Sequence, residues 1–241
     1  MLSKKILKKI PIIKRVYPSL MKIFYKNKKI KFKFFGLDFE GNFGEPMDKE
    51  IFLFNNYENF QIEYLIDNIK KYNSNYFIDI GANSGIYSLI IRDKFHKIKI
   101  KSFEPVKKTA AKFKNNLIFN KKLKNIKLYK FGLSNKNSKL LMRAKIRDGY
   151  IQSSGYGVIK KEDNLKNLHV EKNIFKIGDE TIKLKNKKIC IKIDAEGHEY
   201  EVLQGLKSLL NYNEIFLQVE IFKENFKKIN KYLKSQKFKC I

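Results

Sequence analysis

Residues 76–95 constrain the fold of this chain more than any other segment. Residues 76–80 form an apolar run typical of a buried strand, and residues 85–95 repeat apolar side chains at helical spacing. The loop between them has the pattern D-x-G-x-N-x-G, in which glycine permits a sharp turn and asparagine tolerates a positive φ. A strand, a loop and a helix in this order predict the first unit of an α/β domain, with a ligand at the carboxyl end of the strand.

The segments that follow continue the alternation of strands and helices. Apolar runs predict further strands at residues 98–103, 126–131, 188–193 and 215–221, and helical spacing predicts helices at 106–117, at 202–210 and through residue 233. Parallel strands joined by crossover helices form a sheet with helices on both faces. We therefore expect an α/β fold with a doubly wound, mostly parallel, Rossmann-like sheet in a main domain that spans residues 50–241.

A basic extension, residues 1–49, precedes this domain. Residues 31–40 alternate around Gly36 like a short antiparallel strand pair. At the start of the main domain, residues 58–72 have a helical period that predicts Phe60, Tyr64, Leu65 and Ile69 on one face.

An insert, residues 134–187, separates the third and fourth predicted strands. It does not read as a single helix and is longer than a crossover needs, which predicts a lid or a substrate-binding element. Tyr150, Ser153, Ser154 and Tyr156 have the composition of a carbohydrate-contacting loop, and equally that of a flexible polar loop.

The predicted ligand site includes an acidic residue at the end of the second strand. Glu104 follows Gly85 by nineteen residues, where a carboxylate can accept hydrogen bonds from both ribose hydroxyls. The glycine loop does not match the G-x-G-x-x-G pattern that frees a helix N-terminus for a pyrophosphate. Asp79 suits a ligand with a positive amino group and a sulfonium, so the loop favours S-adenosylmethionine over NAD.

At this point the sequence resembles the FkbM-type methyltransferases of the class I S-adenosylmethionine-dependent fold. The resemblance covers roughly residues 50–235 and rests on FIDIGANSGIYSL, FEP, GLSN, KIDAEGHEYEVLQG and LQVEI. It implies that the cofactor is held by Asp79, Gly81, Asn83, Ser84, Gly85 and Glu104, with Ser134 near the adenine. It also implies methylation of hydroxyl groups, frequently on sugars of glycolipids, polysaccharides or natural products.

The sequence departs from this pattern at its end. Class I sheets usually finish with an antiparallel hairpin, whereas residues 237–241 suffice for one short strand at most. We expect that the sheet is closed differently, that a partner covers its edge, or that the chain is shortened.

Four residues near the fourth and fifth strands are candidates for catalysis. Asp194 and Glu220 end these strands at the same edge of the sheet, and Glu199 is expected to point toward the cleft. A sugar hydroxyl benefits from a general base, and Asp194, His198 and Glu199 could take its proton. Glu199 could instead cap its helix, and His198 could simply be exposed. No metal site is predicted, although Asp194 and Glu220 could ligate Mg²⁺.

The net charge of +28 suggests a nucleic-acid partner at first sight. However, arginine occurs only at positions 15, 92, 143 and 147, and the lysines are scattered through nearly every segment. Recognition of phosphates or bases would favour arginine, whose planar fork binds in a bidentate manner. We interpret most of the charge as a solvated coat and expect no specific nucleic acid. Two cysteines cannot form a disulfide framework, which favours a reducing cytoplasmic compartment.

Residues 1–30 alone combine this charge with an apolar pattern. Leu2, Ile6, Ile10, Ile13, Tyr17 and Leu20 recur at helical spacing among basic residues, which is typical of a helix on the anionic inner face of a membrane. Pro11 and Pro18 are expected to interrupt this helix. The alternative is a helix pair that packs on the main domain.

Together these features predict an S-adenosylmethionine-dependent O-methyltransferase that acts on a saccharide hydroxyl. The alternative is a non-catalytic basic protein of the same fold that binds nucleic acid or an anionic membrane.

Overall fold

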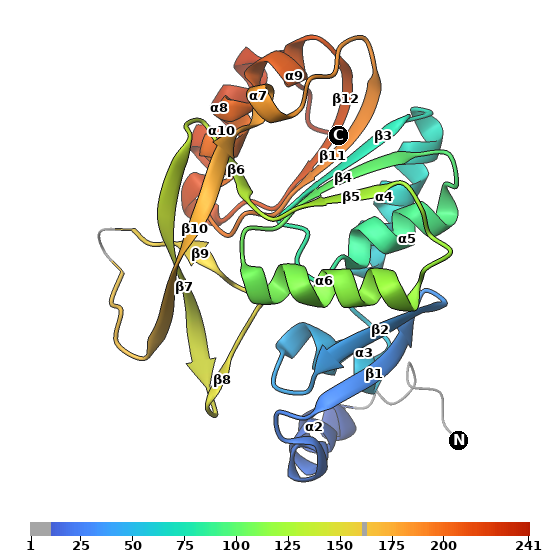
Figure 1. The fold of residues 1–241 in the computed structure, drawn as a ribbon, viewed down its shortest axis with the longest axis vertical. Helices are drawn as coiled ribbons and strands as arrows, with labels where there is room; N and C mark the ends of the chain where they lie inside the picture. The colour runs from blue at the N-terminus through green and yellow to red at the C-terminus, as the bar shows by residue number, and fades with distance from the viewer. Residues whose placement is uncertain (1–10, 161–162) are drawn as a thin grey trace.

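The structure is a computed structural model, and it describes residues 11–160 and 163–241. A five-stranded parallel sheet forms its centre, in the order β12-β11-β3-β4-β5 (Figure 1). These strands are β3 (Tyr76–Ile80), β4 (Lys99–Phe103), β5 (Ile126–Tyr129), β11 (Lys188–Ile193) and β12 (Glu214–Val219). The strand order reverses between β3 and β11, which is the place where open α/β sheets bind ligands.

Helices cover both faces of this sheet, which confirms the doubly wound prediction. One face packs against α4 (Asn59–Lys71), α5 (Ile86–Lys94) and α6 (Lys107–Phe119) through a cluster that includes Phe77 and Cys190. The other face packs against α8 (Glu199–Gly205), α9 (Lys207–Asn211) and α10 (Phe226–Ser235) through a cluster that includes Ile78 and Ile191.

Helix α4 lies where it was predicted, but only part of the predicted apolar face is buried. Phe60 is 74% exposed, whereas Ile62, Leu65 and Ile69 are buried. Phe60 instead stacks on Tyr64 at the surface, with ring centroids 6.1 Å apart. Leu65 and Ile69 thus lie on the core side as predicted, and Ile62, at helical spacing from both, occupies the place expected for Phe60.

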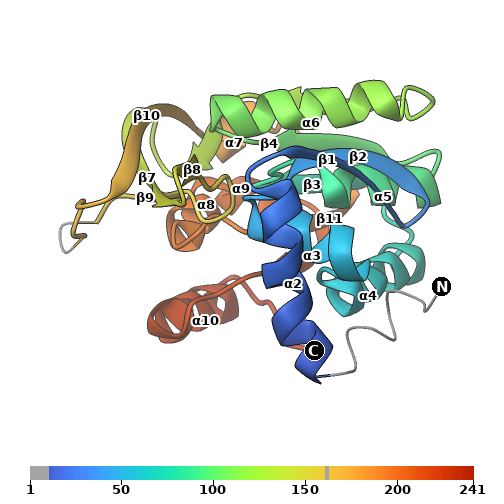
Figure 2. The ribbon, with the colours of Figure 1, turned by 90° about the horizontal axis from the view of Figure 1, so that it is seen from below.

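The N-terminal extension packs on the main domain. It contains α2 (Pro11–Tyr25), the antiparallel pair β1 (Lys29–Phe34) and β2 (Leu37–Asn42), and α3 (Pro46–Phe54), which the sequence analysis did not predict. Figure 2 shows α2 from below, where it runs along α3. The buried residues of β1, β2 and α3 belong to the same apolar cluster as those of α4 and α5.

The expected interruption of α2 at Pro18 is wrong, because the helix continues through this residue. Tyr17, Met21 and Tyr25 pack against the core on both sides of the proline. This packing outweighs the one backbone hydrogen bond that a proline removes from a helix.

The insert forms most of a second sheet beside the first. The strands of this sheet are β6 (Gly132–Ser134), which leads into the insert, β7 (Ser138–Arg147), β8 (Tyr150–Ile151), β9 (Gly157–Val158) and β10 (Leu168–Ile177), and α7 (Gly178–Thr181) follows. The long strands β7 and β10 pair in antiparallel fashion and stand to one side of the central sheet (Figure 1).

The described residues after β12 contain η1 (Lys223–Asn225) and α10 but no strand, so β12 is an edge of the central sheet. Among the helices that the structure describes, none has the length and apolar character needed to cross a bilayer.

Candidate active site

A pocket opens at the carboxyl ends of β3, β4 and β11, where the strand order reverses. One wall is formed by strand ends and the loops that follow them, and the other by the insert. The lining residues are Ile80, Gly81, Asn83, Glu104, Pro105, Gly132, Leu133, Met142, Ser153, Gly155, Tyr156, Phe175, Asp194, Ala195, Glu196 and Val202.

The glycine loop forms the floor of this pocket in the conformation that its sequence requires. Gly81 has φ +76°, and a Cβ at this position would overlap the backbone carbonyl of Asp194. Asn83 also has a positive φ, of 48°. Its side-chain Oδ1 is buried and has no hydrogen-bond partner among the described residues. Because a buried acceptor without a partner is costly, this atom fits a ligand that brings a hydrogen-bond donor.

Glu104 lies at the end of β4, as predicted. Its Oε2 accepts a hydrogen bond from the backbone N–H of Asn83, and its Oε1 accepts one from Val106, both at 2.9 Å. Burial raises the pKa of this carboxyl to about 7. A carboxylate has about four acceptor positions, so both oxygens can still accept from ligand hydroxyls.

These residues fit S-adenosylmethionine. Its amino group can donate to the Asn83 oxygen, and its ribose hydroxyls can donate to Glu104. Because Gly81 has no side chain, its backbone can lie close to the Asp194 carbonyl, and no side chain from this position fills the space at the strand ends.

Four of the predicted cofactor residues, Asp79, Ser84, Gly85 and Ser134, are not among the residues that line the pocket. Asp79 is fully buried, and its Oδ2 accepts a hydrogen bond of 2.6 Å from Ser88 on α5. Ser84 is buried, and its backbone carbonyl accepts a hydrogen bond from the Asn116 amide. The other carboxylate oxygen of Asp79, Oδ1, is buried and has no hydrogen-bond partner among the described residues, so its contact with a cationic ligand group stays a prediction.

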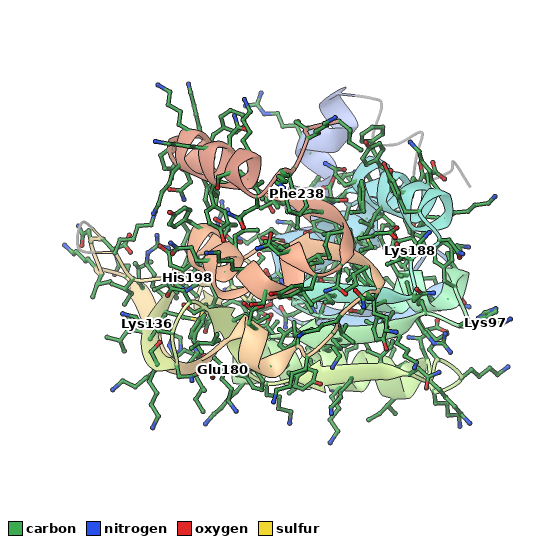
Figure 3. The ribbon with its side chains drawn as sticks, turned by 90° about the horizontal axis from the view of Figure 1, so that it is seen from above. Lys97, Lys136, Glu180, Lys188, His198 and Phe238 are labelled. Atoms are coloured by element: carbon green, nitrogen blue, oxygen red, sulfur yellow. The ribbon has the colours of Figure 1, made fainter. Side chains whose placement is uncertain are left out.

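Ser134 is likewise buried and faces away from the pocket lining. Its Oγ lies 2.9 Å from Nε2 of His198. The ring of His198 packs edge-on against Phe175 with centroids 5.4 Å apart, and burial lowers the pKa of its imidazole. Figure 3 shows His198 beside the ribbon of α8, within the body of the molecule, whereas Lys97 reaches the periphery. His198 is thus neither an exposed residue nor part of the described pocket lining.

Glu199 does not point into the cleft, in contrast to the prediction. The loop before it turns back through positive φ values at Glu196 and Gly197. As a result, Glu199 Oε1 accepts hydrogen bonds from the backbone N–H groups of Gly197 at 2.8 Å and Ala195 at 3.2 Å. Its position corresponds to the capping alternative, because it satisfies free backbone donors before α8.

Asp194 lies on the pocket wall and is paired with a buried lysine. Lys192 Nζ lies 3.0 Å from Asp194 Oδ2 and 4.7 Å from the ring centroid of Tyr87. Burial disfavours the ammonium, but the carboxylates of Asp194 and Asp79 outweigh it and raise the pKa of Lys192. The sequence analysis missed Lys192, although a lysine inside an otherwise apolar parallel strand was a usable signal.

Glu220 reaches solvent at the end of β12, on the next strand. Partial burial and the neighbouring Asp194 carboxyl raise the pKa of Glu220 to about 7. Glu58, which precedes α4, adds a further carboxylate by accepting a 2.6 Å hydrogen bond from the Tyr87 hydroxyl. Within residues 11–160 and 163–241, no group of three His, Cys, Asp or Glu side chains is arranged to hold a metal ion.

Comparisons with known proteins agree with this site. A family model described as the Methyltransferase FkbM domain matches residues 79–240. Methyltransferase sdnD of Sordaria araneosa is 28% identical over 156 residues, and the match spans 54% of this chain and 60% of that relative's length.

Two solved structures were found at 11% identity. One is precorrin-6y C5,15-methyltransferase from Geobacter metallireducens GS-15, with a TM-score of 0.43 over 74% of this chain and 71% of that one. The other is a SAM-dependent methyltransferase from Agrobacterium tumefaciens, with a TM-score of 0.48 over 86% and 57%.

The family match includes the glycine loop, Glu104 and the Asp194 segment, which together form one pocket. The cofactor is S-adenosylmethionine, in agreement with the buried acceptors that line this pocket. The chain belongs to the FkbM methyltransferase family.

Proposed function

We propose that the protein is an O-methyltransferase that methylates a saccharide hydroxyl. The observation that carries the proposal is the Asp194 carboxylate, which lies on the wall of the cofactor pocket and is held by the buried ammonium of Lys192. A hydroxyl acceptor loses a proton on methylation, and a positioned carboxylate can receive that proton.

The cofactor supplies an already activated methyl group on a sulfonium. The residues of the chain therefore have to hold the acceptor oxygen in line and to take its proton. Asp194 is the group that we assign to accept the proton, and the hydrogen bond from Lys192 orients its carboxylate. Glu220, whose pKa is about 7, can receive a proton from solvent-facing groups at the rim.

The choice of a saccharide is supported by the carboxylates around this site. Glu58, Asp194 and Glu220 come from three separate segments, and carboxylates are good acceptors for the several hydroxyls of a sugar. The hydroxyls of Ser153 and Ser154, considered above as sugar contacts, are instead bonded to Glu45.

Methyl transfer to a panel of simple sugars tests this proposal. Purified protein would be incubated with isotope-labelled S-adenosylmethionine and methyl glycosides of common hexoses and deoxyhexoses, and O-methylated products would be identified by mass spectrometry. We expect Asp194→Asn to lower turnover by about 10²-fold or more, while S-adenosylhomocysteine still binds. Asp163→Asn is the matched control, because Asp163 pairs with Arg143 away from the pocket lining.

Wild-type turnover by Asp194→Asn would overturn the role of Asp194, and methylation of nitrogen instead of oxygen would overturn the O-methyltransferase proposal. The non-catalytic alternative predicts the opposite pattern: steeply salt-dependent binding to RNA or anionic lipid, and no binding of S-adenosylhomocysteine.

We also propose that α2 holds the enzyme at an anionic membrane that carries its acceptor. Val16, Leu20, Ile23 and Phe24 form one stripe of the helix, and they are 56%, 51%, 76% and 60% exposed. The adjacent stripe of Tyr17, Met21 and Tyr25 packs on the core. Arg15, Lys22 and Lys26 are exposed on the remaining side. An uncovered apolar stripe beside cations fits a helix that lies in the headgroup region.

Vesicle co-sedimentation tests this surface. Phosphatidylcholine vesicles with and without phosphatidylglycerol would be compared for wild type and for Leu20→Ser/Ile23→Ser/Phe24→Ser. We expect wild type to sediment with the anionic vesicles and the triple variant to lose most of this binding. Leu141→Ser/Ile174→Ser is the control, because both residues are exposed apolar side chains on the distant β7–β10 hairpin. Equal sedimentation of wild type and triple variant would remove the proposal.

A further inference from the structure

A buried carboxylate of the N-terminal extension holds the part of the insert that walls the cofactor pocket. Glu45 is fully buried just before α3. Its Oε2 accepts hydrogen bonds from the backbone N–H of Ser153 at 2.6 Å and from the Ser153 hydroxyl at 2.7 Å. Its Oε1 accepts from the backbone N–H of Ser154 at 3.0 Å and from the Ser154 hydroxyl. One side chain thus binds two consecutive residues through every donor that they have.

The residues held in this way lie at the pocket. Ser153, Gly155 and Tyr156 line it opposite the glycine loop and Glu104. The backbone N–H of Gly155 hydrogen-bonds the carboxylate of Glu196, which lines the same pocket from the segment after β11. The loop of residues 152–157 is therefore held by a carboxylate on each side, one from the extension and one from the segment that carries Asp194.

The backbone around Glu45 keeps this carboxylate in a fixed place. Pro46 follows it and restricts Glu45 to the extended conformation, which it adopts with φ −86° and ψ 120°. Helix α3 is in turn anchored to α6 by Asp48, a fully buried residue that pairs with Lys112. Hydrogen bonds to a charged acceptor are stronger and more directional than neutral ones, so the loop is held in one geometry.

We propose that Glu45 is a positioning residue for S-adenosylmethionine, which acts by fixing the loop of residues 152–157 as a wall of the cofactor pocket. Glu45 lies outside residues 79–240, so the part that the family model matches does not include the carboxylate that holds this wall. The inference rests on the proposed use of this pocket for the methyl donor. A wall that is already ordered lowers the entropy cost of binding, and a loosened wall raises it.

Calorimetric titration of the full chain with S-adenosylhomocysteine tests the proposal. In Glu45→Gln, an NH2 group that cannot accept hydrogen bonds replaces one carboxylate oxygen and faces N–H and O–H donors. In Ser153→Ala/Ser154→Ala, the two hydroxyl donors are lost and the two backbone N–H donors remain. We expect Glu45→Gln to raise the Kd about tenfold or more, and the double variant to raise it by a smaller factor. With S-adenosylmethionine, KM should rise while kcat at saturation stays near wild type. Asp148→Asn is the control, because its ion pair with Lys22 also joins extension and insert but lies outside the pocket lining.

The measurements are made well below the thermal midpoint of each variant, so that a loss of stability alone leaves the Kd of the folded protein unchanged. If wild type binds S-adenosylhomocysteine and both Glu45→Gln and the serine double variant bind it within about twofold of wild type, the role of Glu45 is overturned while the cofactor pocket stands. If wild type itself does not bind, the assignment of the pocket fails first, and the role of Glu45 fails with it.

Discussion

The ammonium of Lys192 lies 3.0 Å from the carboxylate of Asp194, and both groups are largely shielded from water. Lys192 also interacts electrostatically with Asp79, just before the glycine loop. One ammonium therefore compensates the charge of Asp194 on the pocket wall and that of Asp79 behind it. Removal of this cation would leave two partly or fully buried carboxylates without their compensating charge.

We therefore expect Lys192→Met to lower the free energy of unfolding by about 3 kcal/mol, because breaking a buried ion pair from one side is strongly destabilising. Lys188→Met on the same strand should change it by about 1 kcal/mol or less, since Lys188 forms an exposed pair with Glu214. Urea unfolding followed by circular dichroism measures both values. Equal midpoints for the two variants would contradict the role assigned to Lys192.

Glu104 should make stability depend on pH in an unusual direction. An unfolded glutamate titrates near 4.5, whereas the native pKa of Glu104 is about 7. Between these values the native state binds more protons than the unfolded state, so the contribution of Glu104 to stability is lost as the pH rises. Across this window the ionisation of Glu104 should lower the free energy of unfolding by about 3 kcal/mol, at roughly 1.4 kcal/mol per pKa unit. Glu104→Gln should therefore gain stability relative to wild type from pH 4.5 to 7.

The same residue should have the opposite effect on cofactor binding. Ribose hydroxyls donate to the ionised carboxylate, so the affinity of wild type for S-adenosylhomocysteine should increase as the pH rises through about 7. Glu104→Gln should bind weakly at every pH. Titrations of both proteins across this range provide the check, and a wild-type affinity that is flat with pH would count against a contact between Glu104 and the ribose.

Glu220 should control the pH dependence of turnover. Its pKa is about 7 because partial burial and the Asp194 carboxyl disfavour its charge. Glu220 therefore keeps its proton below about pH 7, and turnover that uses Glu220 as a proton acceptor should rise as this proton leaves. Glu220→Gln should flatten or displace this limb of the kcat profile and leave the affinity for S-adenosylhomocysteine unchanged. An identical profile in wild type and variant would show that Glu220 does not set this limb.

Gly81→Ala should displace the glycine loop, because its Cβ would overlap the backbone carbonyl of Asp194. Gly36→Ala is a matched control: Gly36 has φ +83° but no atom within 4 Å of an added Cβ, so it carries only the conformational cost of about 1–2 kcal/mol. We expect Gly81→Ala to be destabilised clearly more than Gly36→Ala and to lose cofactor binding. Thermal unfolding and calorimetry measure the two effects, and similar losses for both variants would argue against the steric contact.

The sequence was sufficient to predict the central sheet and the cofactor loop, since both depend on local patterns. Apolar runs mark each parallel strand because these strands are buried on both faces, and Gly81 and Asn83 mark the turn through their backbone conformations. Glu104 could be placed because it ends a strand whose neighbour carries the loop.

Other features depend on contacts between distant segments and could not be predicted in this way. Glu45 and Ser153 are 108 residues apart in sequence. The direction of the Glu199 side chain depends on the turn at Glu196 and Gly197. This turn points the backbone N–H groups of Ala195 and Gly197 at the Glu199 carboxylate. Asp79 lies in β3, just before the loop, and the hydrogen bond that its Oδ2 accepts from Ser88 on α5 could not be predicted from the sequence.

The shared apolar cluster of β1, β2, α3, α4 and α5 has a consequence for how relatives of this chain can be recombined. The stretch that defines the family by homology, residues 79–240, is smaller than the unit that excludes water around that cluster. A chimera that joins this stretch to the N-terminal region of another member would bring together two halves of one core that were shaped for different partners. The stretch that the family model matches and the apolar core of this protein therefore have different boundaries, and we expect a transplanted unit to need the N-terminal region as well.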